Sequence, residues 1–272
     1  MINLKKVGIK IALPILMVLI WEIVAILLNK PFVLPRVEAV IIILVHPIQK
    51  VLGTGTLIEN AIVSISRVLS GFLLAALIAI PVGIGMGHFK RVNEFVNTLI
   101  ELLRPIPPLA WVPLALAWFG TTAILNLVGI ESFNLIFYNL QVAVIFIIFV
   151  GSFFPILLST IGGVKSVRIT LIETALTLGA KEKDILRKVV IPGASPSILT
   201  GLRIGVGIAW MCVVAAEMLP GSNIGLGYLI IHAYDYARVD IVIAGMIVIG
   251  VIGLCLDTIL RIFEERFKWR AR

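Results

Sequence analysis

The 272-residue chain is 60% hydrophobic and only 14% charged, with a mean hydropathy of +1.12 and a net charge of +8. A soluble domain carries about 25% charged residues, and a single core could not bury this much apolar surface. The composition therefore excludes an ordinary soluble protein and makes lipid the solvent for most of the chain. The positive charge leaves two explanations, a nucleic-acid surface or the positive-inside bias of a membrane protein.

Six segments are long and apolar enough to cross a hydrocarbon core of about 30 Å. The first follows a basic start and lacks a small-residue cleavage site, which favours a retained helix over a removed signal peptide. The sequence predicts an all-α, polytopic membrane protein. Its spans are expected at residues 9–28, 68–86, 99–119, 137–161, 198–218 and 241–262.

Two external segments are apolar but not placed as spans. Segment 35–50 carries few charges and is typical of a helix lying at the outer interface. Segment 121–134 holds an apolar stretch followed by Glu131, and both a surface helix and a partial re-entry stay open.

The third predicted span must break or kink, because it contains several prolines, which lack the backbone N–H that continues a helix. These are Pro105, Pro107, Pro108 and Pro113. Irregular backbone at membrane depth survives only against protein or a water-filled path. We therefore expect this segment to line the pathway, with helix packing as the alternative. The candidates here are Arg104, Pro107, Pro108 and Trp111.

Lysine and arginine placement predicts the orientation. With the N-terminus inside, sixteen basic residues fall on the cytoplasmic side, whereas the outside receives Lys30, Arg36, Lys50 and Arg238. An excess of basic residues marks cytoplasmic loops. We therefore expect a multi-pass protein of the cell membrane with both termini in the cytoplasm, and nucleic-acid binding becomes a weak explanation for the net charge.

Residues 163–192 form the only sizeable polar segment between spans. Leu171, Ala175 and Leu178 recur at i, i+4 and i+7, which predicts a short amphipathic helix. Gly179 follows where a left-handed C′ residue would sit, so the chain can turn sharply there. A pair of basic helices lying on anionic lipid is the alternative, but a helix on lipid needs no fixed corner.

A second short helix is expected over residues 181–190, with Asp184 and Lys188 spaced for an i,i+4 pair. Pro192 is predicted to end this helix. Ser195 and Pro196 are then predicted to be the N-cap and N1 residues of the fifth span.

Charged residues within the spans are candidates for function, because a charge at membrane depth is expensive. Glu217 lies near the outer end of the fifth span, and gating or contact with a docked binding protein is weighed evenly against pairing with Arg67 or capping a turn. Arg104 and Arg203 lie near cytoplasmic ends, where snorkelling or pairing with Glu101 is favoured over anion contact.

The sequence lacks the motifs of metal binding and of phosphate binding. His46, His88 and His232 match no metal-ligand spacing, and Gly-x-x-x-x-Gly-Lys-Ser/Thr does not occur. We expect a chain that is not an enzyme, without metal or cofactor; in an ATP-driven process, a partner subunit would bind and hydrolyse ATP. The Gly-rich stretches 83–87 and 201–207 follow no strand, so close helix packing is expected there.

The polar loop resembles a known motif. Glu173-Thr174-Ala175, then Gly179, then Val189 and Ile191-Pro192 are similar to the EAA loop of binding-protein-dependent ABC importer permeases, with Thr174 for Ala, Val189 for Ile and Ile191 for Leu. The resemblance implies a coupling helix that inserts into a cleft of the nucleotide-binding subunit. It assigns the ATPase-coupling role to Glu173, Ala175, Gly179, Ile191 and Pro192.

Four further stretches resemble permeases of the nitrate, sulfonate and taurine type, within a likeness over about residues 57–260. They are RPIPPLAW at 104–111, SFFPILL at 152–158, PSILTGLR at 196–203 and AAEM at 215–218. The chain is longer than the family pattern between Gly120 and Gly151, which affects the boundaries of the third and fourth spans.

The resemblance implies an importer-type five-helix core plus one N-terminal helix. It divides the chain into an N-terminal helix and external segment at 1–56, a permease core at 57–265 and a cytoplasmic tail at 266–272. The implied partners are ATP-binding subunits, an external solute-binding protein and a second copy in a homodimer, and the implied solute is a small oxyanion such as nitrate, a sulfonate or taurine. An ion-driven secondary transporter is the alternative, but it predicts inverted repeats and midplane acids, and the sequence shows no clear repeat and few such acids.

Overall fold

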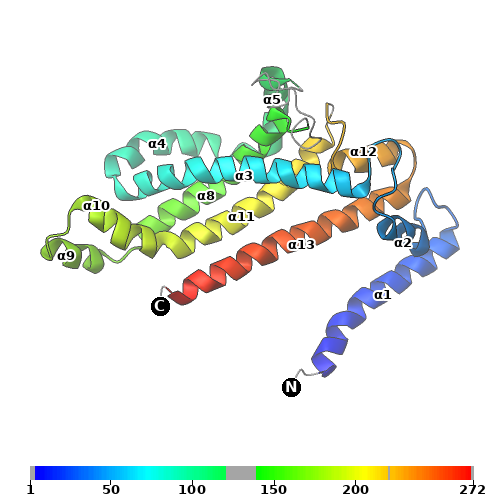
Figure 1. The fold of residues 1–272 in the computed structure, drawn as a ribbon, viewed down its shortest axis with the longest axis horizontal. Helices are drawn as coiled ribbons and strands as arrows, with labels where there is room; N and C mark the ends of the chain where they lie inside the picture. The colour runs from blue at the N-terminus through cyan, green and yellow to red at the C-terminus, as the bar shows by residue number, and fades with distance from the viewer. Residues whose placement is uncertain (1–3, 121–138, 220, 271–272) are drawn as a thin grey trace.

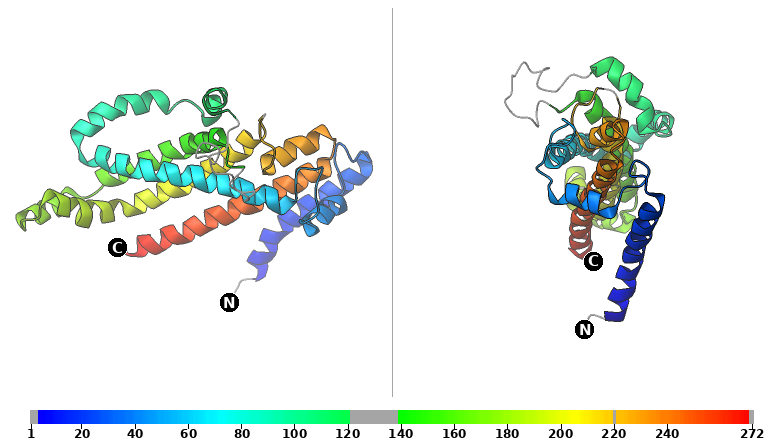
Figure 2. Two further views of the ribbon diagram at one scale, coloured as in Figure 1. Left: turned by 45° about the horizontal axis from the view of Figure 1, so that its top comes forward. Right: turned by 90° about the vertical axis from the view of Figure 1, so that its right-hand side faces the viewer.

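The computed structural model describes residues 4–120, 139–219 and 221–270, and in that part of the chain every regular element is a helix. Four long helices run side by side: α3 (Leu57–His88), α8 (Val142–Lys165), α11 (Ile191–Glu217) and α13 (Val239–Arg270) (Figure 1). Helix α8 lies between α3 and α11, and α13 packs on α11. Shorter elements gather at the ends of these four helices, as the two further views in Figure 2 show.

The long helices lie at predicted spans, and the third predicted span is broken into two helices. Helices over 57–88, 142–165, 182–217 and 239–266 are each long and apolar enough to cross a membrane. Helix α4 (Lys90–Leu103) and the 3-10 turn with α5 (Val112–Phe119) form a pair bent by 85°, so the predicted break at the prolines is confirmed. The described part of the chain thus contains four spans, or five if the bent pair is one span.

The predicted total of six is therefore not confirmed. The first predicted span corresponds to α1 (Leu4–Leu28), which among the described residues forms an apolar helix over Ala12–Leu28 and is not one of the four spans. Helix α1 is joined to the chain that follows it by two polar contacts. The Trp21 indole N–H donates to the Pro35 carbonyl at 3.0 Å, and the Glu22 carboxylate accepts from the Val37 amide at 2.8 Å. Segment 121–134 lies outside the described residues.

The helix expected within segment 35–50 is present as α2 (Val37–Val45), which packs on α13. At the same end, which we call the outer end after the predicted orientation, α12 (Leu226–Asp235) leads into α13. At the opposite end, called the inner end, lie α9 (Ile169–Thr177), α10 (Glu182–Ile185) and a π-helical turn over Leu186–Val190.

Small residues let the long helices approach closely. A Cβ atom on Gly83 would lie 2.7 Å from the Thr160 Cβ atom, and one on Gly201 would lie 2.5 Å from the Ser159 Cβ atom. Small residues are the usual means by which membrane helices pack tightly. The predicted close packing is confirmed at these positions but not at Gly207, around which a Cβ atom would meet nothing within 4 Å. On α3 the small residues recur every fourth position, at Gly71, Ala75, Ala79, Gly83 and Gly87.

The start of α11 differs from the prediction. One helix continues over residues 182–217, so Pro192 does not end a helix, and Ser195 and Pro196 do not begin one. The Ile191 N–H donates to the Leu186 carbonyl, five residues back, in the π turn before the proline. The Pro192 carbonyl, which Pro196 cannot bond because it lacks an N–H, accepts from the Ser195 hydroxyl at 2.8 Å. Local side-chain bonding thus lets the helix pass both prolines.

Candidate functional site

The corner after α9 has the conformation predicted for it. Gly179 has a φ of +80°, in the left-handed region that favours glycine. The Gly179 N–H donates to the Leu176 carbonyl at 2.9 Å, and the Ala180 N–H donates to the Ala175 carbonyl at 3.0 Å. These two bonds form a Schellman motif, which satisfies the last carbonyls of the helix. The corner between α9 and α10 is therefore fixed by hydrogen bonds.

A small apolar cluster holds this corner against the bundle. Its buried members are Val164, Ile185, Val190, Ala194 and Ile198. From α9, Ile172 and Ala175 pack against it, and from α3, Ile80 and Ile84 do so. Helices α3, α8, α10 and α11 all contribute, so the cluster connects α9 to the ends of the long helices. Val164, Ile185 and their neighbours are here called the inner cluster.

The apolar face of α9 that packs is not the predicted stripe. Ala175 faces the inner cluster, but Leu171 and Leu178 are 54% and 82% exposed. Ile169 and Leu176 are also exposed, as is Glu173. The sequence pattern identified an apolar helix correctly, but it could not show that two of its faces are apolar and that only one meets the core. Helix α9 therefore leaves large apolar side chains exposed on both sides of the face that packs.

Charged and polar contacts around the corner are exposed and few. Lys188 and Asp184 form the predicted i,i+4 pair, with Nζ and Oδ1 3.1 Å apart. His88, at the end of α3, lies 3.7 Å from Glu182 on α10, a contact that the sequence did not indicate. Glu173 is exposed, and Ile191 and Pro192 begin α11 beside the inner cluster. The five residues assigned to coupling thus lie along one short path from α9 to α11.

The pathway candidates gather at the bend between α4 and α5. Arg104 is the C-cap of α4, and Pro107 precedes the 3-10 turn Pro108–Trp111. The Trp111 ring meets the Phe146 ring edge-on at a centroid distance of 6.1 Å, and its indole N–H is buried and has no hydrogen-bond partner among the described residues. Glu101 accepts a hydrogen bond from Asn97 at 2.6 Å. The bend therefore brings Arg104, Pro107, Pro108 and Trp111 together, apart from Glu217.

Glu217 lies in a buried polar network at the outer end. Its carboxylate accepts from Arg67 Nη1 at 2.8 Å, from the Ser64 hydroxyl at 2.8 and 2.9 Å and from the Gly227 N–H at 3.0 Å, and both charged side chains are 0% exposed. Arg67 also donates to the carbonyls of Asn139 and Ile224. The structure thus shows the predicted pairing of Glu217 with Arg67.

The sequence did not indicate two members of this outer network. Asn60 accepts from the Gly225 N–H at 2.8 Å, and its amide donates to the carbonyls of Thr54 and Thr56. Gln141 contacts Ser222 and the Gly221 carbonyl. The sequence carries no spacing signal for these contacts, because Gly225 lies 165 residues from Asn60 and Ser222 lies 81 residues from Gln141.

A mixed-charge cluster joins the inner halves of α11 and α13. Arg203 bonds Asp257 through two N–H groups at 2.7 and 3.2 Å and contacts Glu264 at 3.4 Å. Thr200 donates to the other oxygen of Glu264 at 2.6 Å. Arg203 thus pairs with carboxylates of α13, whereas pairing with Glu101 was the predicted alternative; snorkelling stays a prediction.

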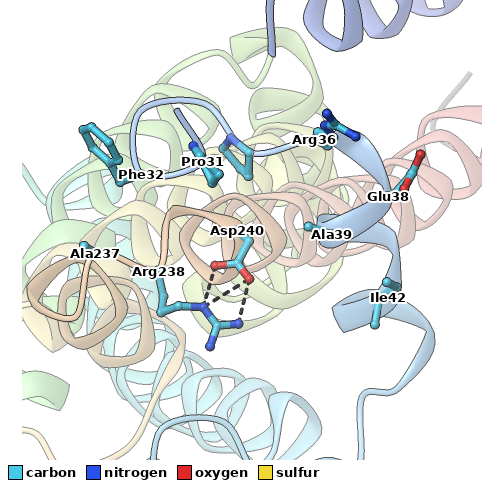
Figure 3. A pocket seen from close by; sticks show the side chains of 10 residues that line it. Pro31, Phe32, Arg36, Glu38, Ala39, Ile42, Ala237, Arg238 and Asp240 are labelled. Carbon is cyan, nitrogen blue, oxygen red and sulfur yellow. Dashed lines mark hydrogen bonds and ion pairs between the residues drawn. The ribbon is translucent and has the colours of Figure 1, made fainter. Parts of the chain in front are cut away.

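A groove of about 570 Å³ opens at the outer end, between the α1–α2 connection and the turn before α13 (Figure 3). Pro31 and Phe32 form part of its apolar wall, and Arg238 reaches Asp240 through hydrogen bonds of 2.7 to 3.2 Å. The hydrogen bonds that Arg238 donates to Asp240 raise the pKa of the Arg238 guanidinium above its ordinary value. Charges of both signs therefore lie at this groove.

Comparison with known proteins agrees with this architecture. The profile of the family described as "Binding-protein-dependent transport system inner membrane component" matches residues 71–269. An ABC transporter permease protein of Methanocaldococcus jannaschii is 62% identical over 270 residues, covering 99% of this chain and 94% of the relative. The taurine transport system permease protein TauC of Escherichia coli is 34% identical, with coverage of 93% and 86%.

The fold is also that of a solved transporter. The MetNI methionine ABC transporter, in an inward-facing conformation, has a chain that superposes with a TM-score of 0.57 at 19% identity, covering 75% of this chain and 94% of that one. A likeness at this identity concerns the fold alone, whereas the family profile covers most of the chain. The protein therefore belongs to the family of binding-protein-dependent transport system inner membrane components, the permeases of ABC transporters.

Proposed function

We propose that this permease serves an ATP-driven importer and that the outward face of α9 docks on a separate ATP-binding subunit. The observation that carries the proposal is the exposure of four large apolar side chains of this short helix, two on each side of the face that packs. Ile169, Leu171, Leu176 and Leu178 are 54 to 82% exposed, and Glu173 is exposed as well. Exposed large apolar side chains gathered on one short element mark a site of interaction. A cleft on the ATP-binding subunit would cover these apolar side chains, and a polar group at its edge would pair with the Glu173 carboxylate.

The inner cluster supplies the connection from the docked helix to the spans. Ala175 packs inward, so its small side chain allows α9 to approach the bundle closely. Gly179 fixes the angle between α9 and α10, and α10 continues through the π turn into α11. Because packed apolar groups transmit displacement, closure of two ATP-binding subunits would move the inner ends of α3, α8 and α11 together. Ile191 and Pro192 lie where that movement would enter α11.

The ends of the long helices support a cytoplasmic α9. Basic residues lie at the end of the bundle that carries α9, where α3 meets α4 and where α8 ends; they include Lys90, Arg91 and Lys165. Figure 1 shows the C-terminal part of α13 directed toward that same end. The positive-inside bias places such an end in the cytoplasm. Both termini are accordingly proposed to be cytoplasmic.

The proposed solute is a small oxyanion such as nitrate, a sulfonate or taurine, delivered by an external solute-binding protein to a homodimer of this chain. The relative that transports taurine supports this class of solute. At the outer end, the groove beside Arg238 and Asp240 provides charges of both signs for contact with the solute-binding protein. The bend at Pro107 and Pro108 supplies irregular backbone, which at membrane depth fits the wall of a path.

Reconstituted uptake tests the function. The permease would be placed in proteoliposomes with an ATP-binding subunit and a solute-binding protein, and the uptake of labelled taurine and nitrate would be measured. We expect uptake that requires ATP and both partners. Uptake that persists without the ATP-binding subunit, or that follows an ion gradient, would instead establish the secondary-transporter alternative.

A pair of variants tests the docking face. Leu178→Ser removes an outward side chain that is 82% exposed, and Phe95→Ser removes one that is 86% exposed on α4. We expect Leu178→Ser to weaken co-purification of the ATP-binding subunit about tenfold, with Phe95→Ser unchanged and both variants inserted normally. Equal retention of the subunit by the two variants would show that α9 lies on lipid or elsewhere.

A further inference from the structure

The backbone that joins α10 to α11 lacks a hydrogen bond that a regular helix would make. The Ile191 N–H donates to the Leu186 carbonyl, five residues back, in the π turn. Within the helix, the Arg187 carbonyl could accept from Ile191, four residues on, or from Pro192, five residues on. Ile191 bonds Leu186 instead, and proline has no N–H. The Arg187 carbonyl therefore receives neither bond.

A second gap in the backbone bonding follows one turn later. Pro196 cannot donate to the Pro192 carbonyl, which accepts from the Ser195 hydroxyl instead. Gly193, between the two prolines, has the backbone freedom of glycine. Sharp bends in helices occur at prolines, at glycines and at π turns, and residues 186–196 contain all three. We call these residues the joint.

The parts on the two sides of the joint are fixed. On one side, hydrogen bonds hold the corner at Gly179 between α9 and α10, which Figure 1 shows beyond the end of α11. On the other side, α11 and α8 touch closely: a Cβ atom on Gly163 would lie 2.6 Å from the Ser197 Cβ atom, and one on Gly201 would lie 2.5 Å from the Ser159 Cβ atom. A change of angle between the corner and α11 must therefore take place at the joint.

The side chains of the joint allow such a change without separation from the bundle. Val190 and Ala194 are 1% and 0% exposed and belong to the inner cluster. Arg187 and Lys188, on the other side of the turn, are exposed. The joint thus has a buried pivot on one side and no packed side chains to displace at Arg187 and Lys188.

We propose that residues 186–196 form a hinge at which α11 tilts against the α9–α10 corner, as the Ile191 N–H moves between the Leu186 and Arg187 carbonyls. In this step one backbone hydrogen bond breaks and another of the same kind forms, and the π turn becomes an α turn. The two forms therefore differ little in hydrogen-bond energy, as a two-state element requires. The role of the hinge in coupling rests on the importer function proposed above, and it places the change of angle at the joint, with Gly179 as a fixed corner.

Hydrogen exchange followed by mass spectrometry tests the hinge on the full-length permease in lipid nanodiscs, without ATP or partner subunits. Pro192→Ala adds an N–H that can bond Arg187 in the π form and Lys188 in the α form, so it stiffens the joint in both. We expect peptides that cover residues 186–196 to exchange about fivefold more slowly in this variant, because one hydrogen bond is gained. The control is Pro155→Ala, which removes a proline inside α8 and should leave exchange at the joint unchanged.

Pro196→Ala provides a second variant for the same measurement, since it supplies the missing donor to the Pro192 carbonyl. It should also slow exchange at the joint, by about fivefold. Gel-filtration profiles show that each variant is folded. Exchange at the joint that is equally fast in the wild type, Pro192→Ala and Pro196→Ala would overturn the hinge, as would an equal slowing by the α8 control.

Transport by the reconstituted complex then tests the use of the hinge. Pro192→Ala and Pro196→Ala should each lower the solute moved per ATP hydrolysed about fivefold, the factor expected for one added bond, while the ATP-binding subunit still co-purifies. Normal coupling in a variant whose exchange has slowed would refute the role of the hinge in transport. Uptake by the wild type that needs no ATP-binding subunit would contradict the importer function instead, and it would leave the exchange results as they are.

Discussion

The two ends of the helical bundle are held together by different interactions. At the outer end, Arg67 and Glu217 form an ion pair with both side chains 0% exposed, and neighbouring backbone amides and hydroxyls complete the network. At the inner end, the Lys188–Asp184 pair is 76% and 47% exposed, and the small inner cluster provides the packing. Breaking a charge pair should therefore cost more free energy at the outer end than at the inner end.

This difference indicates which end can move. A buried pair cannot separate without leaving an uncompensated charge in a medium of low dielectric, so the outer ends of α3, α11 and α12 should behave as one body. An exposed pair exchanges its partners for water at little cost. The inner end, where α9 faces outward, is therefore the part of the molecule suited to respond to a docked partner.

The largest expected effect is at the buried pair. Arg67→Ala leaves the Glu217 carboxylate buried without its cation and should lower the free energy of unfolding by about 3–5 kcal/mol. Chemical denaturation in detergent micelles measures this. The double variant Arg67→Met with Glu217→Gln, which removes both charges and keeps a side chain able to bond Ser64, should recover most of the loss. A double variant as unstable as Arg67→Ala would show that the charges are not the cause.

Packing at the outer end should tolerate almost no added volume. A Cβ atom on Gly227 would lie 2.2 Å from the Val214 carbonyl oxygen, so Gly227→Ala should destabilise the protein by about 1–3 kcal/mol. Gly250→Ala, where a Cβ atom meets nothing within 4 Å, is the matched control. It should be neutral or stabilising by up to about 1 kcal/mol, because alanine favours a helix. Thermal unfolding of the two variants side by side decides this, and equal midpoints would contradict the packing argument.

The inner corner should matter for coupling more than for stability. Gly179→Val forces a β-branched residue into a left-handed conformation, which costs about 1–2 kcal/mol locally. Insertion should stay intact, but solute moved per ATP hydrolysed should fall about tenfold, the equivalent of about 1.4 kcal/mol. Gly179→Asn, which tolerates this conformation, should keep most of the coupling. Unchanged transport by the valine variant in proteoliposomes would refute the role of the corner.

The smallest effect is expected at the exposed pair. Asp184→Asn should change the free energy of unfolding by only about 0.3–0.5 kcal/mol. Adding 1 M salt to the wild type should produce a similar loss, because salt screens exposed charges. An effect as large as that of Arg67→Ala would mean that the inner end is held as firmly as the outer end.

Much of the fold could be predicted from the sequence, because the relevant signals are local. Length and apolar content identified the four long spans, the prolines identified the break after Arg104, and Gly179 identified the corner. The Asp184–Lys188 pair followed from helical spacing alone. Each of these features depends on residues a few positions apart.

The errors came from interactions that local patterns do not contain. Pro192 and Pro196 were expected to end and begin helices, but a π turn and the Ser195 hydroxyl satisfy the backbone, and the helix continues. Pairing with Glu101 was one expectation for Arg203, but its partners lie on α13, 54 and 61 residues away.

The sequence by itself determined the class of protein, the positions of most spans and the turn at Gly179, because lipid selects apolar length and a left-handed residue selects glycine. Only the tertiary structure decided which face of α9 packs inward, that Arg67 meets Glu217 across 150 residues, and that Arg203 bonds Asp257 on α13. These outcomes depend on which helix faces meet. Small residues on α3 and α11 set that choice by admitting α8 at close range.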